Sequence, residues 1–552
     1  MDNGLWRPVC CESVSLLVKY LYRKSLFCKN IEIYLERNDV VYKENEKLFN
    51  IAEYLLEDCN LRKGRQDKVA VYYRSEVYTY IELNEKANQY ANYLVSKGIP
   101  KGNRIGIYLY SSPHFVALFL GAIKAGIIPV LINTKMNCKE VLHIMESTRC
   151  VFLFADKRLK SNLSNFNGRQ AQKIIMDYEE QTGKMQKEFN AHMTKKEDEA
   201  FIIFTSGSSG KPKGVVHRQV AIKHCIESYG VNILQSEETD IFYSPSQLSY
   251  AMGLGINLYF PFAVGASAVL QENDDLYSVL DNLRKYPVTK FFAVPSVYKY
   301  LDWLIPEGEN PFRNSKICLA AGEALPRYLY DVWENRFKKS IYQSYGMTET
   351  LFAIVADCDH KKALGLPVLG YQVDIVDELG RKVDTGQEGE ITVTGDSVMM
   401  AYWENESQTK KVLRDSTFFT GDRGYLDEEG LLWYIGRNKD MFKRNGEWQS
   451  VNPIEENILS NTSIMETAVV LEIDKQGNNK LVAYVAIQYD RSYKEVFSGI
   501  KEQFLIQGMH NYIPDRWVVL AEIPKGTTGK TDRNQLKQEI PVYVVDNDEL
   551  EI

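Results

Sequence analysis

The chain has 552 residues, of which 45% are hydrophobic and 25% charged, and its formal net charge is −7. This length exceeds one ordinary domain and predicts roughly two to four units, and the composition is that of a globular protein with a sizeable core. A negative net charge without a basic stripe argues against a nucleic-acid-binding protein.

The cysteines and histidines show no pattern of metal or disulfide sites. Nine cysteines are scattered along the chain without a CxxC pair, which is typical of reduced thiols in the cytoplasm. The seven histidines include no HExxH spacing, so we expect no structural metal. Charges at Arg7, Glu12 and Lys19 interrupt a would-be signal peptide, and no stretch reaches the roughly 20 apolar residues of a membrane span. We therefore expect a cytoplasmic protein without a membrane span.

The N-terminal half alternates between strand and helix patterns. Residues 1–45 are expected to form an extension whose amphipathic helix packs on the body. VAVYYRSEVYTY then predicts a hairpin with its turn near Arg74. A helix ended by Gly98, the strand RIGIYLY, a helix capped by Ser112 and the strand PVLIN follow. A parallel sheet covered by helices requires such an alternation.

The second half changes in character twice. The polar stretch 157–199 is expected to be mobile, and the strand–helix alternation resumes after it. Past Lys362 the pattern becomes the short strands and turns of a small β unit. The charged run Arg437–Asn445 predicts a linker between domains, because it separates two patterned blocks.

These patterns together predict an α/β fold with two domains. The large N-terminal domain, residues 46–438, would contain doubly wound mixed sheets plus the small β unit. A small α+β domain would span 439–540, followed by an acidic tail over 541–552, of which the end DNDELEI is expected to be frayed.

The stretch FIIFTSGSSGKPKGVVH, residues 201–217, predicts a loop that binds an anion. Small residues fill 205–210 after an apolar run, and Lys211 and Lys213 follow. Residues without bulky side chains let backbone N–H groups converge on an anion, and hydroxyls and ammoniums add donors. The glycine spacing excludes a Walker A loop. A flexible linker is the alternative, but the strand-like flank favours a polyphosphate loop.

Five motifs occur in the order typical of the adenylate-forming superfamily, which the chain resembles from about Leu48 to Lys537. This superfamily includes acyl- and aryl-CoA synthetases, adenylation domains of nonribosomal peptide synthetases and firefly luciferase. The motifs are TSGSSGKPKG, AAGEALP, QSYGMTET, the pair FFTGDRGYLD and YIGRNKD, and IPKGTTGKTDR. The resemblance implies that ATP and Mg²⁺ convert a carboxylic acid into an acyl-adenylate with release of pyrophosphate, before transfer to a thiol.

The resemblance also implies a role for each motif residue. Lys530 would act between the substrate carboxylate and the α-phosphate, Thr348 would contact the α-phosphate, and Glu349 would hold Mg²⁺. Asp422 would bind the ribose and Arg437 would reinforce it. The other expected ATP-binding residues are Thr205, Ser206, Gly207, Ser208, Ser209, Gly210, Lys213, Gly322, Glu323, Ala324, Ser344, Tyr345, Gly346 and Met347.

The middle of the chain is most similar to benzoate-type CoA ligases, which suggests an aryl or other compact acid. The expected substrate-pocket residues are Tyr250, Met252, Gly253 and Phe352. Met252 and Phe352 stand where such ligases have a tyrosine and a histidine, which implies a more apolar pocket for an unsubstituted aryl or medium acyl chain. The alternative is that both are ordinary core residues.

The acceptor is expected to be coenzyme A. Lys439 matches the hinge about which the family rotates its small domain, which implies that the C-terminal domain is mobile. The resemblance also implies that Gly446 belongs to a loop that contributes to the thiol tunnel. After Gly446 the chain is longer than CoA-using relatives by our alignment, so the phosphopantetheine of a separate carrier protein is the alternative. A luciferase-like oxygenase and a non-catalytic sensor are less favoured, because nothing marks oxygen chemistry and both Lys530 and Glu349 are present.

Overall fold

The structure is a computed structural model of the chain. It describes residues 48–205, 212–273, 275–323, 325–357, 363–444, 447–461, 463–473, 479–487, 492–525, 531–533 and 535–550. The chain divides into two units, Met1–Phe49 and Asn50–Ile552, and the elements below belong to the second. The expected extension over 1–45 lies outside the described residues.

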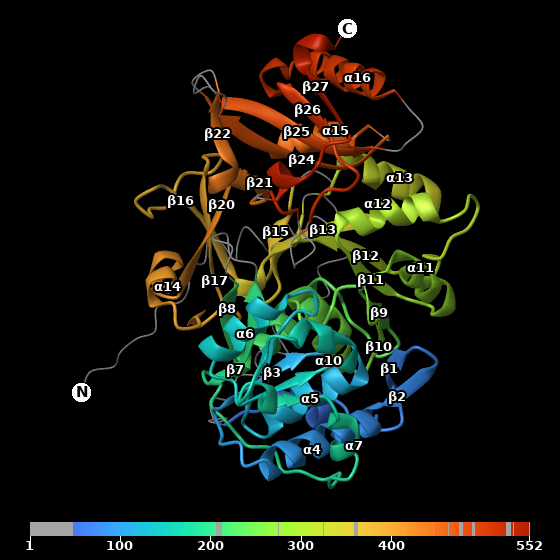
Figure 1. Cartoon of the computed structure of the whole chain (residues 1–552), viewed down its shortest axis with the longest axis vertical. Helices are drawn as coiled ribbons and strands as arrows, with labels where there is room; N and C mark the ends of the chain where they lie inside the picture. Colours follow the sequence, from blue (N-terminus) through green and yellow to red (C-terminus); the bar gives the residue numbers. More distant parts are fainter. Residues whose placement is uncertain are drawn as a thin grey trace. The chain divides into compact units, whose positions relative to one another are not determined.

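Sheet 1 has the strand order β18-β8-β7-β4-β3-β5-β6. Figure 1 labels β3, β7 and β8 of this sheet. Strands β7, β4, β3, β5 and β6 are parallel, and β8 and β18 are antiparallel to their neighbours. All residues of β4 are buried, as in a sheet that is covered on both faces. The bounds are β3 Arg104–Tyr108, β4 Ile128–Leu131, β5 Phe152–Ala155, β6 Ile174–Ile175, β7 Glu199–Thr205, β8 Lys213–Arg218 and β18 Ala401–Tyr402.

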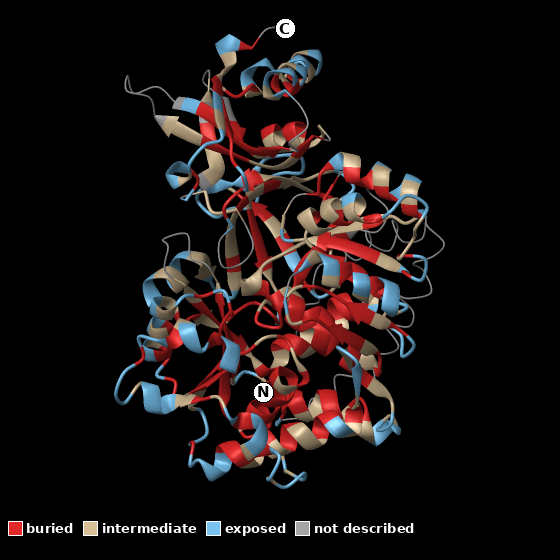
Figure 2. Cartoon of the chain, turned by 45° about the vertical axis from the view of Figure 1, so that its right-hand side comes forward, coloured by how far each residue is buried: buried red, intermediate tan, exposed pale blue. Residues whose placement is uncertain are grey.

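Sheet 2 has the order β15-β14-β13-β12-β11-β9-β10-β1-β2, with β13 through β1 parallel. Figure 2 shows that buried residues gather in the interior of the molecule and exposed residues on its periphery. The bounds are β1 Val69–Tyr73, β2 Glu76–Thr79, β9 Ile241–Tyr243, β10 Ser267–Leu270, β11 Lys290–Ala293, β12 Ile317–Ala321, β13 Ile341–Gly346, β14 Ala353–Asp357 and β15 Leu366–Pro367.

Two smaller regions of strand follow. Sheet 3 has the antiparallel order β16-β17-β20-β19, with β21 on β20, and a β22–β23 hairpin comes after it. The C-terminal sheet has the order β24-β25-β26-β27. The bounds are β16 Gln372–Val376, β17 Gly389–Thr394, β19 Leu413–Arg414, β20 Thr417–Leu426, β21 Leu432–Arg437, β22 Met441–Arg444, β23 Glu447–Ser450, β24 Ile464–Ile473, β25 Asn479–Ile487, β26 Arg516–Val519 and β27 Tyr543–Asp546.

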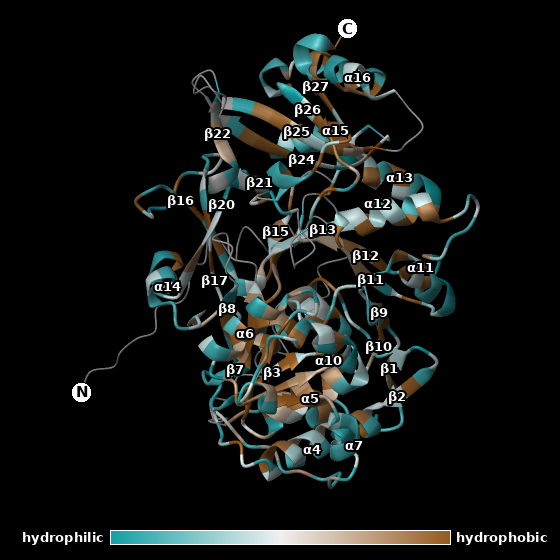
Figure 3. Ribbon diagram, viewed as in Figure 1, coloured by the Kyte–Doolittle hydropathy of each residue, from teal (hydrophilic) through white to brown (hydrophobic). Residues whose placement is uncertain are grey.

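Helix α5 (Pro113–Lys124) illustrates how local sequence sets the helices. Ser112 accepts a hydrogen bond from the Phe115 N–H at 3.2 Å, and Pro113 suits the first turn because it lacks an N–H. The helix is buried and strongly apolar (Figure 3). The other helices are α3 Ile51–Glu53, α4 Tyr80–Ser96, α6 Cys138–Ser147, α7 Tyr178–Thr182, α8 Gln219–Cys225, α9 Ala251–Leu254, α10 Phe260–Val264, α11 Leu276–Lys285, α12 Pro295–Leu304, α13 Arg327–Phe337, α14 Glu406–Val412, α15 Asn452–Leu459 and α16 Tyr493–Ile506.

Short 3-10 or π-helical turns connect several of these elements. They are η1 Tyr54–Asp58, η2 Leu61–Lys63, η3 Lys157–Leu163, η4 Ala171–Lys173, η5 Ile226–Gly230, η6 Gly255–Tyr259, η7 Thr348–Thr350, η8 Asn438–Asp440, η9 His510–Tyr512, η10 Leu536–Gln538 and η11 Asn547–Glu549. In the part of the chain that the structure describes, no helix has the length and apolar character that crossing a bilayer requires.

The predicted fold class is confirmed: the molecule is α/β, with mixed sheets in a large N-terminal region and a smaller C-terminal region. Two local predictions are wrong. The polar stretch 157–199 contains η3, β6 and α7, and Tyr178 of α7 is buried. The acidic end is not frayed over Asp546–Leu550, because Asp546 pairs with Arg516 in the β26–β27 register and Leu550 is buried.

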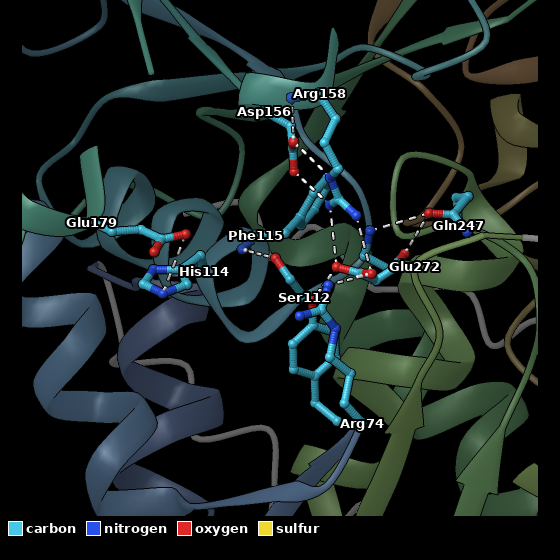
Figure 4. A network of polar contacts seen from close by, with 11 residues as sticks. Arg74, Ser112, His114, Phe115, Asp156, Arg158, Glu179, Gln247 and Glu272 are labelled. Atoms are coloured by element: carbon cyan, nitrogen blue, oxygen red, sulfur yellow. Dashed lines mark hydrogen bonds and ion pairs between the residues drawn. The ribbon is translucent and has the colours of Figure 1, made fainter. Parts of the chain in front are cut away.

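The carboxyl ends of strands in sheets 1 and 2 meet through polar contacts. The Ser111 backbone N–H, beyond β3, donates to Gln247 Oε1 at 3.1 Å, beyond β9. Arg158 bonds Asp156 at 2.7 Å and Glu272 at 3.1 Å, and these acids follow β5 and β10 (Figure 4). Ligands of open α/β sheets bind at such carboxyl ends, so we place the candidate site at this edge.

Candidate active site

The β7–β8 hairpin carries the two described ends of the predicted phosphate loop. Thr205 ends β7 and faces Lys213 at the start of β8 in the antiparallel register. The Lys213 ammonium lies 5.2 Å from the centre of the Tyr402 ring, within the range of a cation–π contact. The predicted residues Ser206, Gly207, Ser208, Ser209 and Gly210 lie outside the described residues.

Glu349, the predicted metal ligand, lies in η7 directly after β13. The Tyr402 hydroxyl donates to Glu349 Oε1 at 2.6 Å. Burial, and then the charge of Glu349, raise the pKa of Tyr402, so the phenol remains a neutral donor. A carboxylate is the ligand type that Mg²⁺ takes beside phosphates, and Glu349 fits this role. The sequence did not reveal Tyr402, since a single tyrosine in a short strand carries no local signal.

The segment before Glu349 is held by close packing. An added Cβ on Gly346 would lie 2.4 Å from the Phe352 carbonyl oxygen, so only glycine fits there. Both the N–H and the carbonyl of Met347 bond the Thr350 hydroxyl, at 3.1 and 3.0 Å. Thr348 begins η7 beside them. This packing fixes the backbone path of the predicted α-phosphate contact.

Asp422, the predicted ribose ligand, is buried between two donors. Tyr345 donates its hydroxyl to Asp422 Oδ2 at 2.7 Å. Arg437 faces Asp422 in the β20–β21 register and places Nε 3.3 Å from Oδ1. Burial alone would lower the pKa of Arg437, but the charge of Asp422 raises it, so the guanidinium stays charged. Three predicted ATP-binding residues from β13, β20 and β21 therefore meet.

The predicted adenine segment begins at the carboxyl end of β12. Gly322 has φ +94°, a left-handed conformation that favours glycine. The Met252 methyl lies 3.9 Å from where a Cβ on Gly322 would be, so the predicted acid and adenine segments are neighbours. Glu323 follows Gly322, and Ala324 lies outside the described residues.

Phe352 belongs to a buried aromatic cluster. Its ring centre lies 4.9 Å from that of Tyr229 and 4.7 Å from that of Phe260. Tyr229 also contacts Ser344, with 2.6 Å between the two hydroxyl oxygens. Tyr229 thus joins a predicted ATP-binding residue to a predicted pocket residue, and sequence reasoning missed it because the IESYG segment resembles ordinary helix.

The remaining predicted pocket residues lie on α9 or at its start. Tyr250 precedes the helix and is half-buried. Gly253 packs on the preceding turn, where an added Cβ would lie 2.1 Å from the Gln247 carbonyl oxygen. This contact alone requires a glycine, and a role of Gly253 toward an acid stays a prediction.

The predicted catalytic and hinge positions of the C-terminal region are only partly described. Lys530 and Gly446 lie outside the described residues, although Lys525 and Thr531, which flank Lys530, form a bridge. Lys439 lies in η8 between β21 and β22, at the predicted boundary. Their roles stay predictions.

Comparison with known proteins agrees with this arrangement. The family model described as AMP-binding enzyme matches residues 60–403. A 4-hydroxybenzoate–CoA/benzoate–CoA ligase of Rhodopseudomonas palustris is 29% identical over 501 residues, covering 87% of this chain and 92% of that protein. A benzoate–CoA ligase of Thauera aromatica is 29% identical over 510 residues, covering 89% and 96%.

Solved structures are similar as well. A benzoate CoA ligase from Burkholderia xenovorans has a TM-score of 0.81 at 27% identity, covering 89% of this chain and all of that one. An anthranilate CoA ligase with bound anthranoyl-AMP has a TM-score of 0.84 at 24% identity, covering 89% and 97%, which shows a shared fold. Because the family model covers more than half of the chain, this protein belongs to the AMP-binding enzyme family.

Proposed function

We propose that this enzyme uses Mg²⁺ and ATP to convert an aromatic carboxylic acid into an acyl-adenylate, and then transfers the acyl group to coenzyme A. The observation that carries the proposal is the meeting of segments far apart in the chain around the end of β13. Lys213 and Glu349 lie at Tyr402, and Tyr345 bonds Asp422 beside Arg437. The names of the relatives support the choice of acid and acceptor.

In the first half-reaction, a carboxylate oxygen of the acid bonds to the α-phosphorus and the bond to the β-phosphate oxygen breaks, so pyrophosphate leaves. Positioning and charge neutralisation are the protein's main contributions to such a reaction. Lys213 would contact the phosphates, and Asp422 with Arg437 would hold the ribose. Mg²⁺, when held by Glu349, would neutralise phosphate charge. Lys530 would orient the carboxylate and the α-phosphate.

In the second half-reaction, the thiol of coenzyme A attacks the acyl carbon and AMP leaves with the bonding electrons. We assign Lys439 as the hinge about which the C-terminal domain, proposed to span 439–540, reorients between the two steps. Gly446 would then belong to the loop that approaches the thiol. A cytoplasmic location stays a prediction that rests on the cysteine pattern.

The aromatic cluster supports an apolar acid. Phe352 is 7% exposed and packs between Tyr229 and Phe260, and the hydroxyl of Tyr229 already contacts Ser344. A substrate hydroxyl placed against Phe352 would lose its hydrogen bonds to water without replacing them. Such a loss costs about 1–3 kcal/mol, so we expect benzoate to exceed 4-hydroxybenzoate in kcat/KM by roughly 10- to 100-fold.

Purified enzyme with ATP, Mg²⁺ and coenzyme A should form AMP and benzoyl-CoA, measured by chromatography across benzoate, hydroxybenzoates and medium-chain acids. Equal kcat/KM for benzoate and 4-hydroxybenzoate would contradict the apolar site. AMP formation without any CoA thioester, but with a thioester on a phosphopantetheinyl carrier protein, would replace coenzyme A by the carrier. In a matched variant, Phe352→His, the discrimination against 4-hydroxybenzoate should decrease.

A further inference from the structure

Tyr402 joins the phosphate strand to the carboxylate that we assign to the metal. Its hydroxyl donates to Glu349 at 2.6 Å, and its ring faces the Lys213 ammonium at 5.2 Å. No other hydrogen-bond donor within the described ranges contacts the Glu349 side chain. One side chain therefore contacts both charges that face the predicted polyphosphate.

The backbone around Tyr402 is fixed on both sides. The Met399 N–H donates to the Glu349 carbonyl at 2.8 Å, and the Met400 N–H donates to the Val216 carbonyl at 2.9 Å. The Trp403 N–H donates to the Gly214 carbonyl at 2.7 Å. Strand β18 thus pairs with β8, while Met399, two residues before the strand, bonds η7. The separation between the phosphate strand and Glu349 is set by this segment.

The side chain of Trp403 anchors the same segment to sheet 1. Its indole N–H donates to the Ser147 carbonyl at 2.9 Å, and the Arg104 guanidinium lies 4.0 Å from its ring centre. Backbone and side-chain contacts together leave Tyr402 little freedom to move away from Glu349. A tyrosine held in this way can keep the Glu349 carboxylate and the Lys213 ammonium in fixed positions.

The chemistry of a phenol suits this position. A hydrogen bond to Oε1 orients the carboxylate and leaves its negative charge and its second oxygen for a cation. A lysine in the place of Tyr402 would neutralise the carboxylate instead. The ring face attracts the ammonium of Lys213 without consuming its N–H donors, which remain for phosphate oxygens.

We propose that Tyr402 is a positioning residue that orients Glu349 toward Mg²⁺ and Lys213 toward the polyphosphate of ATP. This inference rests on the proposed function, because it takes Glu349 as the metal ligand and Lys213 as a phosphate contact. It assigns a role to a residue outside the five motifs. The hydroxyl and the ring have separable effects, so two substitutions distinguish them.

Tyr402→Phe removes the hydroxyl and keeps the ring. Loss of a partner that orients a metal ligand typically lowers metal affinity 10- to 100-fold, so we expect half-maximal adenylation to need about tenfold more free Mg²⁺. The KM for the acid should not change. Tyr402→Leu also removes the ring face, and the added loss of a cation–π contact should weaken ATP binding by about two- to fivefold more.

Tyr78→Phe is the matched control. The Tyr78 hydroxyl donates to Glu76 at 2.6 Å, and the Lys86 ammonium lies 5.7 Å from its ring centre. Tyr78 and Glu76 lie in β2 and Lys86 lies in α4, away from the candidate site. This variant loses the same kind of hydrogen bond, and its Mg²⁺ dependence should equal that of the wild type.

A binding readout accompanies the activity. We expect the thermal stabilisation of the full chain by α,β-methylene-ATP to require about tenfold more Mg²⁺ in Tyr402→Phe than in Tyr78→Phe. Equal Mg²⁺ dependence of both variants, with unchanged melting temperature in the absence of ligand, would overturn the inference. If the wild type forms no adenylate with any acid, the proposed function fails instead. A variant that unfolds is replaced by Tyr402→His, whose ring retains a donor and should restore part of the Mg²⁺ affinity.

Discussion

At the scale of single residues, each of the two carboxylates of the candidate site accepts a hydrogen bond from a neutral tyrosine. Tyr345 bonds Asp422 and Tyr402 bonds Glu349, at 2.7 and 2.6 Å. Burial raises the pKa of both phenols, so each donates without carrying charge. Each phenol thereby orients its carboxylate without placing a positive charge beside it.

His217 gives a pH-dependent test of the strand that carries Lys213. It is fully buried in β8 with its ring 5.1 Å from that of Phe201, and burial lowers its pKa to about 3. The unfolded chain binds the proton near pH 6.5, so stability from neutral His217 is present above that pH and is lost as the pH falls toward 3. Between pH 6.5 and 5.5 this loss amounts to about 1 kcal/mol.

The measurement compares melting temperature against pH for wild type and His217→Gln. After normalisation at pH 8, the variant should lose less stability on acidification than the wild type. Parallel curves for the two proteins between pH 6.5 and 5 would show that His217 is not held neutral by burial.

Some residue roles were visible in the sequence and others were not. Asp422, Arg437 and Glu349 were predicted because they stand in motifs, and the structure brings Asp422 and Arg437 together. Tyr402 and Tyr229 were missed, because their importance comes from partners supplied by distant strands. A tyrosine hydroxyl has no sequence pattern that identifies its acceptor.

At the scale of elements, predictions succeeded where local chemistry decides the structure. Ser112 caps α5, Gly98 follows α4 with φ +69°, and the hairpin β1–β2 turns at Arg74. The prediction that 157–199 is mobile was wrong, because this mostly polar stretch contains buried residues such as Tyr178. The ring of Tyr178 lies 6.4 Å from that of Phe154. The composition of a segment indicates only how exposed its residues are on average. A few buried apolar side chains are enough to give a mostly polar connecting segment a defined structure.

The acidic C-terminus provides a test at the scale of elements. Val545 in β27 and Leu550 beyond it are buried in the core of the C-terminal sheet. Burying one such side chain contributes about 1.5–3 kcal/mol, so removal of residues 541–552 should destabilise this region strongly. Hydrogen exchange of β26 should accelerate in that truncation and not in one that removes only 551–552. Unchanged hydrogen exchange in both truncations would show that Val545 and Leu550 do not stabilise this region.

At the scale of the whole molecule, the sheets and not the motifs determine where the site lies. The predicted ATP-binding residues follow β7, β12 and β13 at their carboxyl ends, and sheet 3 contributes Asp422 and Arg437. The network of Arg158, Asp156 and Glu272 ties the carboxyl end of β5 in sheet 1 to that of β10 in sheet 2 (Figure 4). The order of the motifs along the chain indicated the family. The meeting of the predicted ATP-binding residues in space depends on the order of the strands in the sheets, which cannot be read from the sequence.

The membership of the AMP-binding enzyme family, and the likeness to benzoate-type ligases, were both predicted and are confirmed. Lys530, the predicted catalytic residue, is among the predicted site residues that lie outside the described part of the chain. Removing one preorganised contact to a transition state costs about 10²–10³ in rate, so Lys530→Ala should lose at least that factor in adenylation.

The central claim is that a carboxylic acid attacks the α-phosphorus of ATP and releases pyrophosphate. Exchange of labelled pyrophosphate into ATP, with benzoate and without coenzyme A, measures this step directly. We predict Mg²⁺-dependent exchange that requires the acid and falls by about 10²-fold or more in Lys530→Ala. Folded wild-type enzyme that shows no exchange with benzoate or any other acid of the panel would contradict the proposed function, and wild-type exchange in Lys530→Ala would contradict the assignment of that lysine.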